Sequence, residues 1–379
     1  MSRASASSGG SATSRRPAPE PAAVADVAPA LAAHLRESML RWYAVHRRDL
    51  PWRREPDAYR VWISEIMCQQ TRVDTVIPYF ERWMLAFPTL PSLAAADIQQ
   101  VLQIWQGLGY YSRARNLHAA AQYVVTHCGG ELPRTVEGLR AVPGIGPYTA
   151  GAIASIAWGQ SAPLVDGNVM RVLSRWFVMD KDLRTTAAQK ELWALATQLV
   201  QGPHPSEWNQ SLMELGATVC SPIRPKCLLC PVVDVCGARR EGRESELPVK
   251  SAAHAVRQES WWSVRWVRPD GTELIARRRD TGLWAGLWEW PMVQVSEASP
   301  GAEFGSLPWT AVGPPLVHVL SHIRMQVTPV VVVLSSLSEE PQIADSVASL
   351  YAEFRWVPSN WSADHPASVL TRKLMQAHG

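Results

Sequence analysis

AVPGIGPYTAGAI, residues 141–153, combines a tight turn with the start of a helix. Pro143, Gly144 and Gly146 allow the chain to turn sharply and to bring its backbone close to a partner. Pro147 suits the first position of a helix, where its missing N–H has no partner within the helix in any case. Free N–H groups at a helix start bind phosphate well. The stretch predicts a helix-hairpin-helix that binds a backbone phosphate of DNA, with a plain connection between two helices as the alternative.

The chain around this turn has the periodicity of helices. From Ala30 to about Gly237, apolar residues recur at helical spacing, without the period-two alternation that strands show. Helices are predicted over residues 28–46, 57–71, 72–86, 96–105, 112–127, 147–158, 167–178, 186–200 and 206–219. We therefore predict a helical domain over residues 30–237, and a disordered low-complexity tail at 1–29.

The pattern changes after a polar segment at 238–258, which we predict to be an interdomain linker. Residues 260–278 hold two runs of strand-forming residues around a PDGT turn, which predicts a hairpin. Further elements are predicted as strands at 325–334 and 352–358 and as a helix at 367–378. Residues 259–379 therefore form a second, mixed α/β domain, and a length of 379 residues agrees with two domains.

Charge and hydropathy limit the function classes. Residues 1–250 hold 27 Lys and Arg against 22 Asp and Glu, whereas residues 251–379 hold 10 against 12. A basic first part suits a polyanion, although this excess alone is weak support for nucleic acid. The sequence has no run of about 18 apolar residues, so it predicts no membrane span, and its polar start predicts no signal peptide.

Four of the six cysteines are clustered within residues 220–236 and have the spacing C-x6-C-x2-C-x5-C. Such a cluster in a long chain is typical of a metal site rather than of a disulfide framework. The spacing alone leaves zinc and a [4Fe–4S] cluster both open. The two other cysteines, Cys68 and Cys128, are predicted to be free packing residues. The four predicted metal ligands are Cys220, Cys227, Cys230 and Cys236.

Together these features resemble the helix-hairpin-helix DNA glycosylases of the endonuclease III superfamily, and most closely their MutY branch, the adenine DNA glycosylases. The matching stretches are LPWR (50–53), VWISEIMCQQTRVDTVIPYFERW (61–83), QGLGYYSRARNLH (106–118), VPGIGPYTAGAI (142–153), VDGNVMRV (165–172) and the cysteine loop. The resemblance implies an all-α glycosylase domain of two helical lobes with DNA between them and a [4Fe–4S] cluster in the loop 220–236, followed by an α/β Nudix-like domain.

Two carboxylates are the candidate catalytic groups. Glu65 lies in a predicted helix among apolar residues, and such surroundings raise a carboxyl pKa. The resemblance implies that Glu65 is the general acid that protonates adenine at N7. It also implies that Asp166 stabilises the cationic sugar or a covalent sugar intermediate. Asp166 also has the sequence context of a helix N-cap, which favours its ionised form.

Tyr148 occupies the position after the hairpin where the strand-cutting branch of the superfamily carries a Schiff-base lysine. A phenol forms no Schiff base, so the resemblance implies a monofunctional enzyme that removes the base without cutting the strand. Tyr148 and Asn168 are then expected to hydrogen-bond around the reacting sugar and Asp166. Met170 departs from relatives that carry a lysine here, but that lysine is not the essential catalyst.

The resemblance also implies contacts to DNA. The residues expected near the opposing base are Gln70, Leu108 and Tyr110. The residues expected to line the adenine pocket are Trp52, Arg53 and Glu214. The hairpin contacts are expected at Gly144 and Gly146. Cys68 stands at a pocket position where leucine is usual, which changes the pocket fit. Flipping the target base out of the stack is the step that these contacts would serve.

The second domain contains GLWAGLWEWP (282–291), which resembles the core of a Nudix fold, but no REx2EE metal-binding box follows. LSHIR (320–324) resembles the loop that reads 8-oxoguanine opposite the target adenine, with Leu320 in place of the usual phenylalanine. The resemblance therefore implies that Ser321 and His322 contact the damaged base.

We therefore predict a monomeric adenine DNA glycosylase of base excision repair that acts on adenine opposite 8-oxoguanine or G in double-stranded DNA. The main alternative is a bifunctional glycosylase/lyase of the same superfamily that acts on damaged pyrimidines. A non-catalytic iron–sulfur protein would not need both carboxylates, and a Nudix pyrophosphatase would need the missing box. The expected location is the bacterial cytoplasm with the nucleoid, or an organelle or nucleus in a eukaryote.

Overall fold

The computed structural model describes residues 26–249, 256–295, 309–311 and 313–378. Most of the predicted tail therefore lies outside the described residues. The helices of the first part are α1 (Pro29–His46), α2 (Pro51–Arg54), α3 (Ala58–Cys68), α4 (Val73–Ala86), α5 (Leu90–Ala95), α6 (Ile98–Trp105), α7 (Ser112–His127), α8 (Val136–Ala141), α9 (Pro147–Trp158), α10 (Gly167–Trp176), α11 (Thr186–Leu199), α12 (Pro205–Thr218), η1 (Cys227–Leu229) and α13 (Gly237–Glu241).

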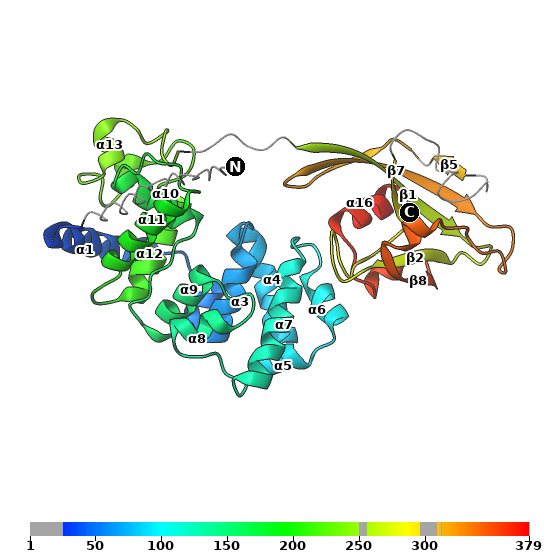
Figure 1. Cartoon of the computed structure of the whole chain (residues 1–379), viewed down its shortest axis with the longest axis horizontal. Coiled ribbons are helices and arrows are strands. Elements are labelled where there is room, and N and C mark those ends of the chain that lie inside the picture. Colours follow the sequence, from blue (N-terminus) through cyan, green and yellow to red (C-terminus); the bar gives the residue numbers. More distant parts are fainter. Residues whose placement is uncertain (1–25, 250–255, 296–308, 312, 379) are drawn as a thin grey trace, which may run out of the picture.

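These helices enclose two separate hydrophobic cores. The first core is built from α3 to α9, and the second from α1 and α10 to α12 together with the loop after α12. Helix α9 contributes to both, because Ile153 belongs to the first core and Ala152 to the second. Figure 1 shows the two groups of helices, with α9 between α3 and α12. The residues that follow the hairpin thus lie where the two lobes meet.

The first part of the predicted linker 238–258 is structured. Helix α13 lies in it, and Leu247 is buried and accepts a hydrogen bond of 3.0 Å from Nε of Arg175 on α10. This stretch therefore packs on the second lobe, which its polar composition did not predict. Residues 250–255 lie outside the described residues, and the first strand begins at Arg257.

The second part of the chain is a mixed sheet in the order β3-β2-β1-β7-β5, with β4 on β1, β6 on β7 and β8 on β2. The predicted hairpin forms, and β1 also runs parallel to β7 along its full length. The elements are β1 (Arg257–Val267), β2 (Glu273–Arg278), β3 (Trp288–Glu289), β4 (Met292–Val295), β5 (Trp309–Ala311), β6 (Leu316–Val319), β7 (Ile323–Val333), α15 (Asp345–Ala348), β8 (Tyr351–Val357), η2 (Trp361–Ala363) and α16 (Val369–His378).

The sheet domain is bonded to the first helical lobe. Leu287 is buried in the core of that lobe. The amide of Gln99 accepts a hydrogen bond from Nε1 of Trp288 (3.1 Å), and that of Gln103 donates one to the carbonyl of Ala363 (2.8 Å). Figure 1 shows the sheet on the side of α6, away from the second lobe. A stripe of glutamines on α6 thus forms part of the seam between the domains.

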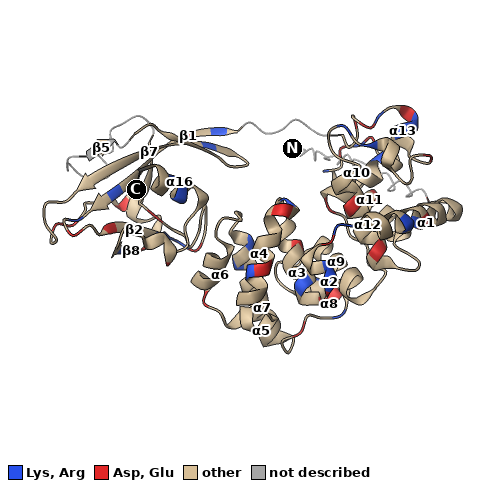
Figure 2. Cartoon of the chain, turned by 180° about the vertical axis from the view of Figure 1, so that it is seen from behind, with Lys and Arg blue, Asp and Glu red and all other residues tan. Residues whose placement is uncertain are grey.

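Charged residues of both signs occur in the helical part and in the sheet domain (Figure 2). Any site must be identified from particular side chains and their surroundings.

Candidate active site

Glu65 lies in the middle of α3, a helix that Asp57 caps through a hydrogen bond of 2.9 Å from the backbone N–H of Arg60. Helix α3 is buried along most of its length, and only 9% of Glu65 is exposed. The hydroxyl of Tyr148, in the first turn of α9, donates a hydrogen bond to Oε2 of Glu65. The hairpin and the acidic helix are therefore joined at this pair of side chains.

Burial raises the pKa of Glu65 to about 7, as the apolar setting of its helix predicts. The hydrogen bond from Tyr148 and the charge of Arg53 act in the opposite direction, and the negative charge of Asp166 adds to the increase. Near neutral pH, a substantial fraction of Glu65 therefore carries a proton that it can donate.

Asp166 is the N-cap of α10, as the sequence predicted. Its Oδ1 accepts hydrogen bonds from the backbone N–H groups of Asn168 (2.9 Å) and Val169 (2.7 Å), and its Oδ2 accepts one from the side-chain amide of Asn168 (2.8 Å). Burial raises the pKa of Asp166, although these hydrogen bonds lower it. The hydrogen bonds to Asp166 thus offset part, but not all, of the free-energy cost that burial adds to the ionisation of this half-buried carboxyl.

Asn168 is held in place from two sides. Its Oδ1 accepts a hydrogen bond of 2.8 Å from Nη2 of Arg171. A Cβ atom at Gly216 on α12 would lie 2.5 Å from the Cβ of Asn168, so glycine is needed for α12 to approach this closely. The amide that supports Asp166 is therefore fixed by the packing of the second lobe.

The two carboxylates come from different lobes, Glu65 from the first and Asp166 from the second. Tyr148 lies between the lobes, bonded to Glu65 and 3.6 Å from the sulfur of Met213 on α12. The charge of Asp166 reaches Glu65, since it raises the pKa of Glu65. A proton donor and a hydrogen-bonded second carboxyl at one seam can together serve a reaction that protonates a leaving group and creates a cation.

Glu214, predicted to line a base pocket, is fully buried on α12. Its Oε1 accepts a hydrogen bond of 2.6 Å from Nε of Arg48, and its Oε2 accepts one of 2.8 Å from Nη2 of Arg53. Burial alone would raise the pKa of Glu214, but the hydrogen bonds and charges of both arginines lower it below its ordinary value. Glu214 is thus an ion-pair anchor for the segment that carries Trp52 and Arg53.

Trp52 is itself 8% exposed, and its ring meets Phe80 edge-on at a centroid distance of 5.3 Å. Arg48 belongs to no recognisable sequence motif, and only the folded structure shows that it pairs with Glu214.

Cys68, at the end of α3, is half-buried, and burial raises the pKa of its thiol to about 12, so it stays protonated. This agrees with its prediction as a packing residue.

Two exposed turns carry the residues that were predicted to contact the opposing base. Gln70 follows α3 with φ 55° and Tyr110 precedes α7 with φ 48°, both in the left-handed region that favours glycine. The ring of Tyr110 is 49% exposed. Leu108, predicted to lie beside it as a DNA contact, is only 6% exposed and belongs to the core of the first lobe.

The hairpin between α8 and α9 has the predicted form. Gly144 has φ 83°, and Gly144 and Gly146 are both exposed, whereas Ile145 between them is buried. Gly146 is the N-cap of α9 and Pro147 its first residue. The first N–H groups of α9 therefore begin at the surface, as a phosphate-binding helix start requires.

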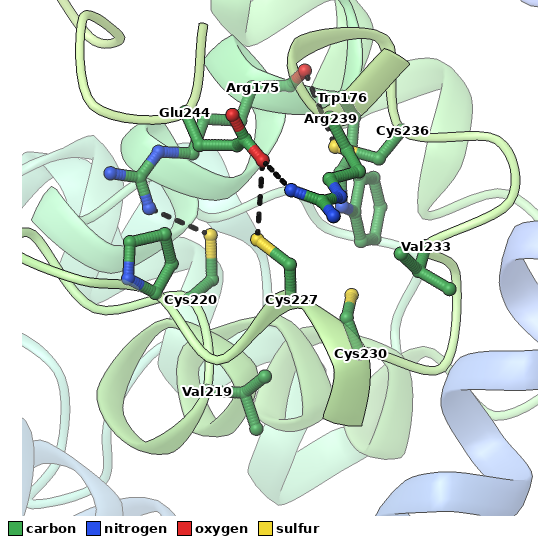
Figure 3. Close-up of a pocket in the computed structure, with 11 residues that line it drawn as sticks. Arg175, Trp176, Val219, Cys220, Cys227, Cys230, Val233, Cys236, Arg239 and Glu244 are labelled. Atoms are coloured by element: carbon green, nitrogen blue, oxygen red, sulfur yellow. Dashed lines mark hydrogen bonds and ion pairs between the residues drawn. The ribbon is translucent and has the colours of Figure 1, made fainter. Parts of the chain in front are cut away.

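The four clustered cysteines line one cavity with Arg175 and Glu244 (Figure 3). Nη1 of Arg175 donates to Sγ of Cys220 at 3.2 Å, and Sγ of Cys227 lies 3.8 Å from Oε1 of Glu244. Among the described residues, no group of three or more His, Cys, Asp or Glu is arranged to hold one metal ion. The thiols thus surround a common space without converging on a single point.

Ser321 and His322 form the exposed turn between β6 and β7. Oγ of Ser321 and Nδ1 of His322 are 3.2 Å apart, and the backbone N–H of Leu320 bonds to the carbonyl of Ile323 (2.8 Å). The side chain of Leu320 packs against the core between the sheet and α16. The structure thus presents both polar side chains at the tip of a hairpin and uses Leu320 for packing.

Comparisons with known proteins agree with this architecture. The model of the HhH-GPD superfamily of base excision DNA repair proteins matches residues 63–198, and that of the NUDIX domain matches residues 263–377. The solved structure of a thermostable thymine-DNA glycosylase superposes with a TM-score of 0.51 at 28% identity and covers 55% of this chain and 97% of that one. The chain is thus a helix-hairpin-helix glycosylase-type protein with an appended Nudix-like domain.

Curated relatives make the assignment of the protein family more specific. The adenine DNA glycosylase of Homo sapiens is 40% identical over 355 residues, covering 76% of this chain and 65% of that protein. The adenine DNA glycosylase of Rattus norvegicus is 40% identical over 353 residues, covering 76% of this chain and 68% of that protein. The chain belongs to the MutY-type adenine DNA glycosylase family, and it spans about two thirds of the length of these relatives.

A membrane helix was not predicted. In the described ranges, no helix is both long and apolar enough to cross a bilayer.

Proposed function

We propose that the protein removes adenine paired with 8-oxoguanine, or with G, from double-stranded DNA by hydrolysis of the N-glycosidic bond. The observation that carries this proposal is the pair of carboxylates at the lobe seam, where buried Glu65 bonds to Tyr148 and Asp166 caps the opposite lobe's helix. The family membership supports the choice of adenine as the base. Double-stranded DNA is the partner that the hairpin would hold.

The chemistry assigns one role to each side chain. Glu65 donates its proton to N7 of adenine, and the electrons of the bond between C1′ and N9 leave with the base. The sugar becomes a cation, and the carboxylate of Asp166 stabilises it. Water then adds to C1′ and releases a proton, which leaves an abasic site. Tyr148 orients Glu65, and Asn168 orients Asp166.

The remaining predicted contacts prepare this reaction. The target adenine has to leave the stack, and Gln70 and Tyr110, which lie on exposed turns, would occupy the gap. The N–H groups after Gly146 bind a backbone phosphate. Ser321 and His322 at the hairpin tip read the opposing 8-oxoguanine.

Base removal without strand cutting follows from Tyr148, since a phenol forms no Schiff base with the sugar. The test uses an end-labelled duplex with a single 8-oxoguanine:A pair, analysed on a denaturing gel with and without hot alkali. We expect cleavage of the adenine strand only after alkali. Matched duplexes with G:A and T:A measure the preference, and T:A should remain uncut.

Cleavage without alkali, or trapping of a covalent adduct by borohydride, would instead support the alternative, a bifunctional glycosylase/lyase. A duplex with an oxidised pyrimidine is the positive test of that alternative. Protein that leaves every adenine duplex intact while it cuts this one would overturn the proposal.

The rate of excision should depend on the protonation of Glu65. Because Glu65 acts in its protonated form and has a pKa of about 7, the single-turnover rate should fall above neutral pH, approaching about tenfold per pH unit. Rates measured between about pH 5.5 and about pH 9 check this, with duplex binding measured in parallel as the control. A rate that is constant or rises across pH 7 would rule out Glu65 as the acid.

The cysteine loop is proposed to hold a [4Fe–4S] cluster through Cys220, Cys227, Cys230 and Cys236. The four thiols line one cavity, and four cysteine thiolates are the ligand set that such a cluster would require. When bound, the cluster joins the loop into one unit and adds its own charge there. Arg175 donates a hydrogen bond to Sγ of Cys220 and so places a positive charge beside the proposed ligands.

Metal content separates the two candidates that the spacing left open. Protein purified without oxygen should contain about four iron and four inorganic sulfide per chain, with broad visible absorption that dithionite or oxidants alter. Removal of the metal should release the loop that Arg175 holds through Cys220 and Ser221, and should lower the melting temperature. About one zinc per chain with no sulfide would contradict the assignment.

A further inference from the structure

The turns that carry Gln70 and Tyr110 come from different parts of the first lobe. Gln70 follows α3, and Tyr110 precedes α7, some forty residues later in the chain. Both residues have positive φ without being glycine. Such conformations cost free energy and persist only where surrounding contacts hold them. Something must therefore fix both turns.

Arg113 on α7 holds the first turn. Its Nη1 donates hydrogen bonds to three carbonyls at the end of α3, those of Ile66 (2.8 Å), Met67 (2.9 Å) and Gln69 (2.6 Å). The last carbonyls of a helix have no partner within the helix. Here Nη1 of Arg113 takes the place of the N–H groups that a further helical turn would supply. The carbonyl of Gln69 belongs to the peptide unit directly before Gln70.

The same guanidinium holds the second turn. Its Nη2 donates to Oγ1 of Thr71 (3.2 Å) and to the carbonyl of Gly109 (3.1 Å), directly before Tyr110. The guanidinium carbon also lies 5.4 Å from the ring centre of Tyr110, within the range of a cation–π contact. The guanidinium group of Arg113 thus links five hydrogen-bond acceptors, which belong to the end of α3 and to the two turns.

We propose that Arg113 is a positioning residue that fixes the spacing of Gln70 and Tyr110, so that both side chains enter the duplex together. This inference rests on the proposed function, because it assumes that these turns insert beside the flipped adenine.

A phosphate contact is the usual role of an arginine in a DNA-binding protein, and the two roles predict different results. A phosphate contact that is lost weakens binding and reduces the salt slope of binding by about one. Arg113 is half-buried, and its Nη atoms bond to protein carbonyls and a hydroxyl. Loss of the bridge should therefore leave the salt slope unchanged and slow base extrusion.

The test is Arg113→Lys, because an ammonium keeps the charge but cannot span both turns as a planar fork. Extrusion is followed in stopped flow by the fluorescence of 2-aminopurine beside the target adenine. We expect extrusion and single-turnover excision to slow by about tenfold or more. An adenine opposite an abasic gap, which is already unpaired, should be excised within about threefold of the wild-type rate.

Arg115→Lys is the matched control. Arg115 lies two residues further along α7, is also half-buried and bonds to the carbonyl of Ala285 (2.8 Å) in the Nudix-like domain. It should extrude the base at the wild-type rate. If Arg113→Lys unfolds, Thr71→Val removes one acceptor of the bridge and should show a smaller slowing of the same kind.

Equal extrusion rates in Arg113→Lys and wild type would overturn the inference. A reduced salt slope with normal extrusion in Arg113→Gln, which removes the charge, would also overturn it. The proposed function is tested separately by whether wild-type protein excises adenine at all. Wild-type protein that excises adenine without any change in 2-aminopurine fluorescence would refute the insertion step and leave the proposed reaction standing.

Discussion

Glu65→Gln is expected to lower the single-turnover rate of adenine excision by roughly 10²–10⁴-fold. Glutamine has nearly the same shape and can still accept the hydrogen bond from Tyr148, so the packing of α3 should persist. It has no proton to transfer at neutral pH, so adenine would leave without protonation at N7. The measurement is the rate of alkali-labile site formation with enzyme in excess over duplex.

The matched controls for Glu65→Gln separate chemistry from binding. Affinity for a duplex with a non-hydrolysable adenine analogue should remain within about threefold, and the variant should lose the fall in rate above neutral pH. A Glu65→Gln protein that excises adenine within about threefold of the wild-type rate would show that another group supplies the proton.

Asp166→Asn should lower the excision rate by roughly 10²–10³-fold, because it removes the negative charge that we propose stabilises the sugar cation. Its effect on stability should be small, since asparagine is also a good N-cap and can still accept the N–H of Val169 (2.7 Å in the native cap). The rate and the melting temperature are measured on the same preparation.

Asp166→Ala separates the two roles of this residue. Alanine removes the charge and the cap together, so it should lose activity to a similar extent and also lose about 0.5–2 kcal/mol of stability. If Asp166→Asn instead retained nearly full activity, the residue would be a structural cap only, and the cation would have to be stabilised by another group.

Local signals made much of the fold predictable. The proline and glycine pattern of residues 142–147 determines the hairpin, and the predicted helix 147–158 agrees with α9. Asp166 could be recognised as a helix cap because aspartate is a favoured N-cap residue directly before a helical stretch. The PDGT turn likewise predicted the hairpin of β1 and β2.

Contacts between distant residues could not be predicted in this way. The pair formed by Arg48 and Glu214 spans 166 residues, and no local pattern marks Arg48 as its partner. Leu108 lies in a motif that suggested a DNA contact, yet the turn directs its side chain into the core. Leu247 is apolar in a polar stretch, and only the position of Arg175 shows that it packs there.

The Arg113 bridge could not be predicted from the sequence for the same reason. Its acceptors are mostly backbone carbonyls, which every residue possesses and which leave no trace in the sequence. The sequence could mark Gln70 and Tyr110 as candidates, but not the side chain that holds both turns.

The most direct measurement is the amount of free base released from a duplex with one 8-oxoguanine:A pair, identified by mass spectrometry. The account predicts about one free adenine per duplex, an intact phosphodiester backbone before alkali, and no adenine from the T:A duplex of the same sequence. Release of no adenine by protein that carries the proposed cluster, or strand scission in the absence of alkali, would contradict it.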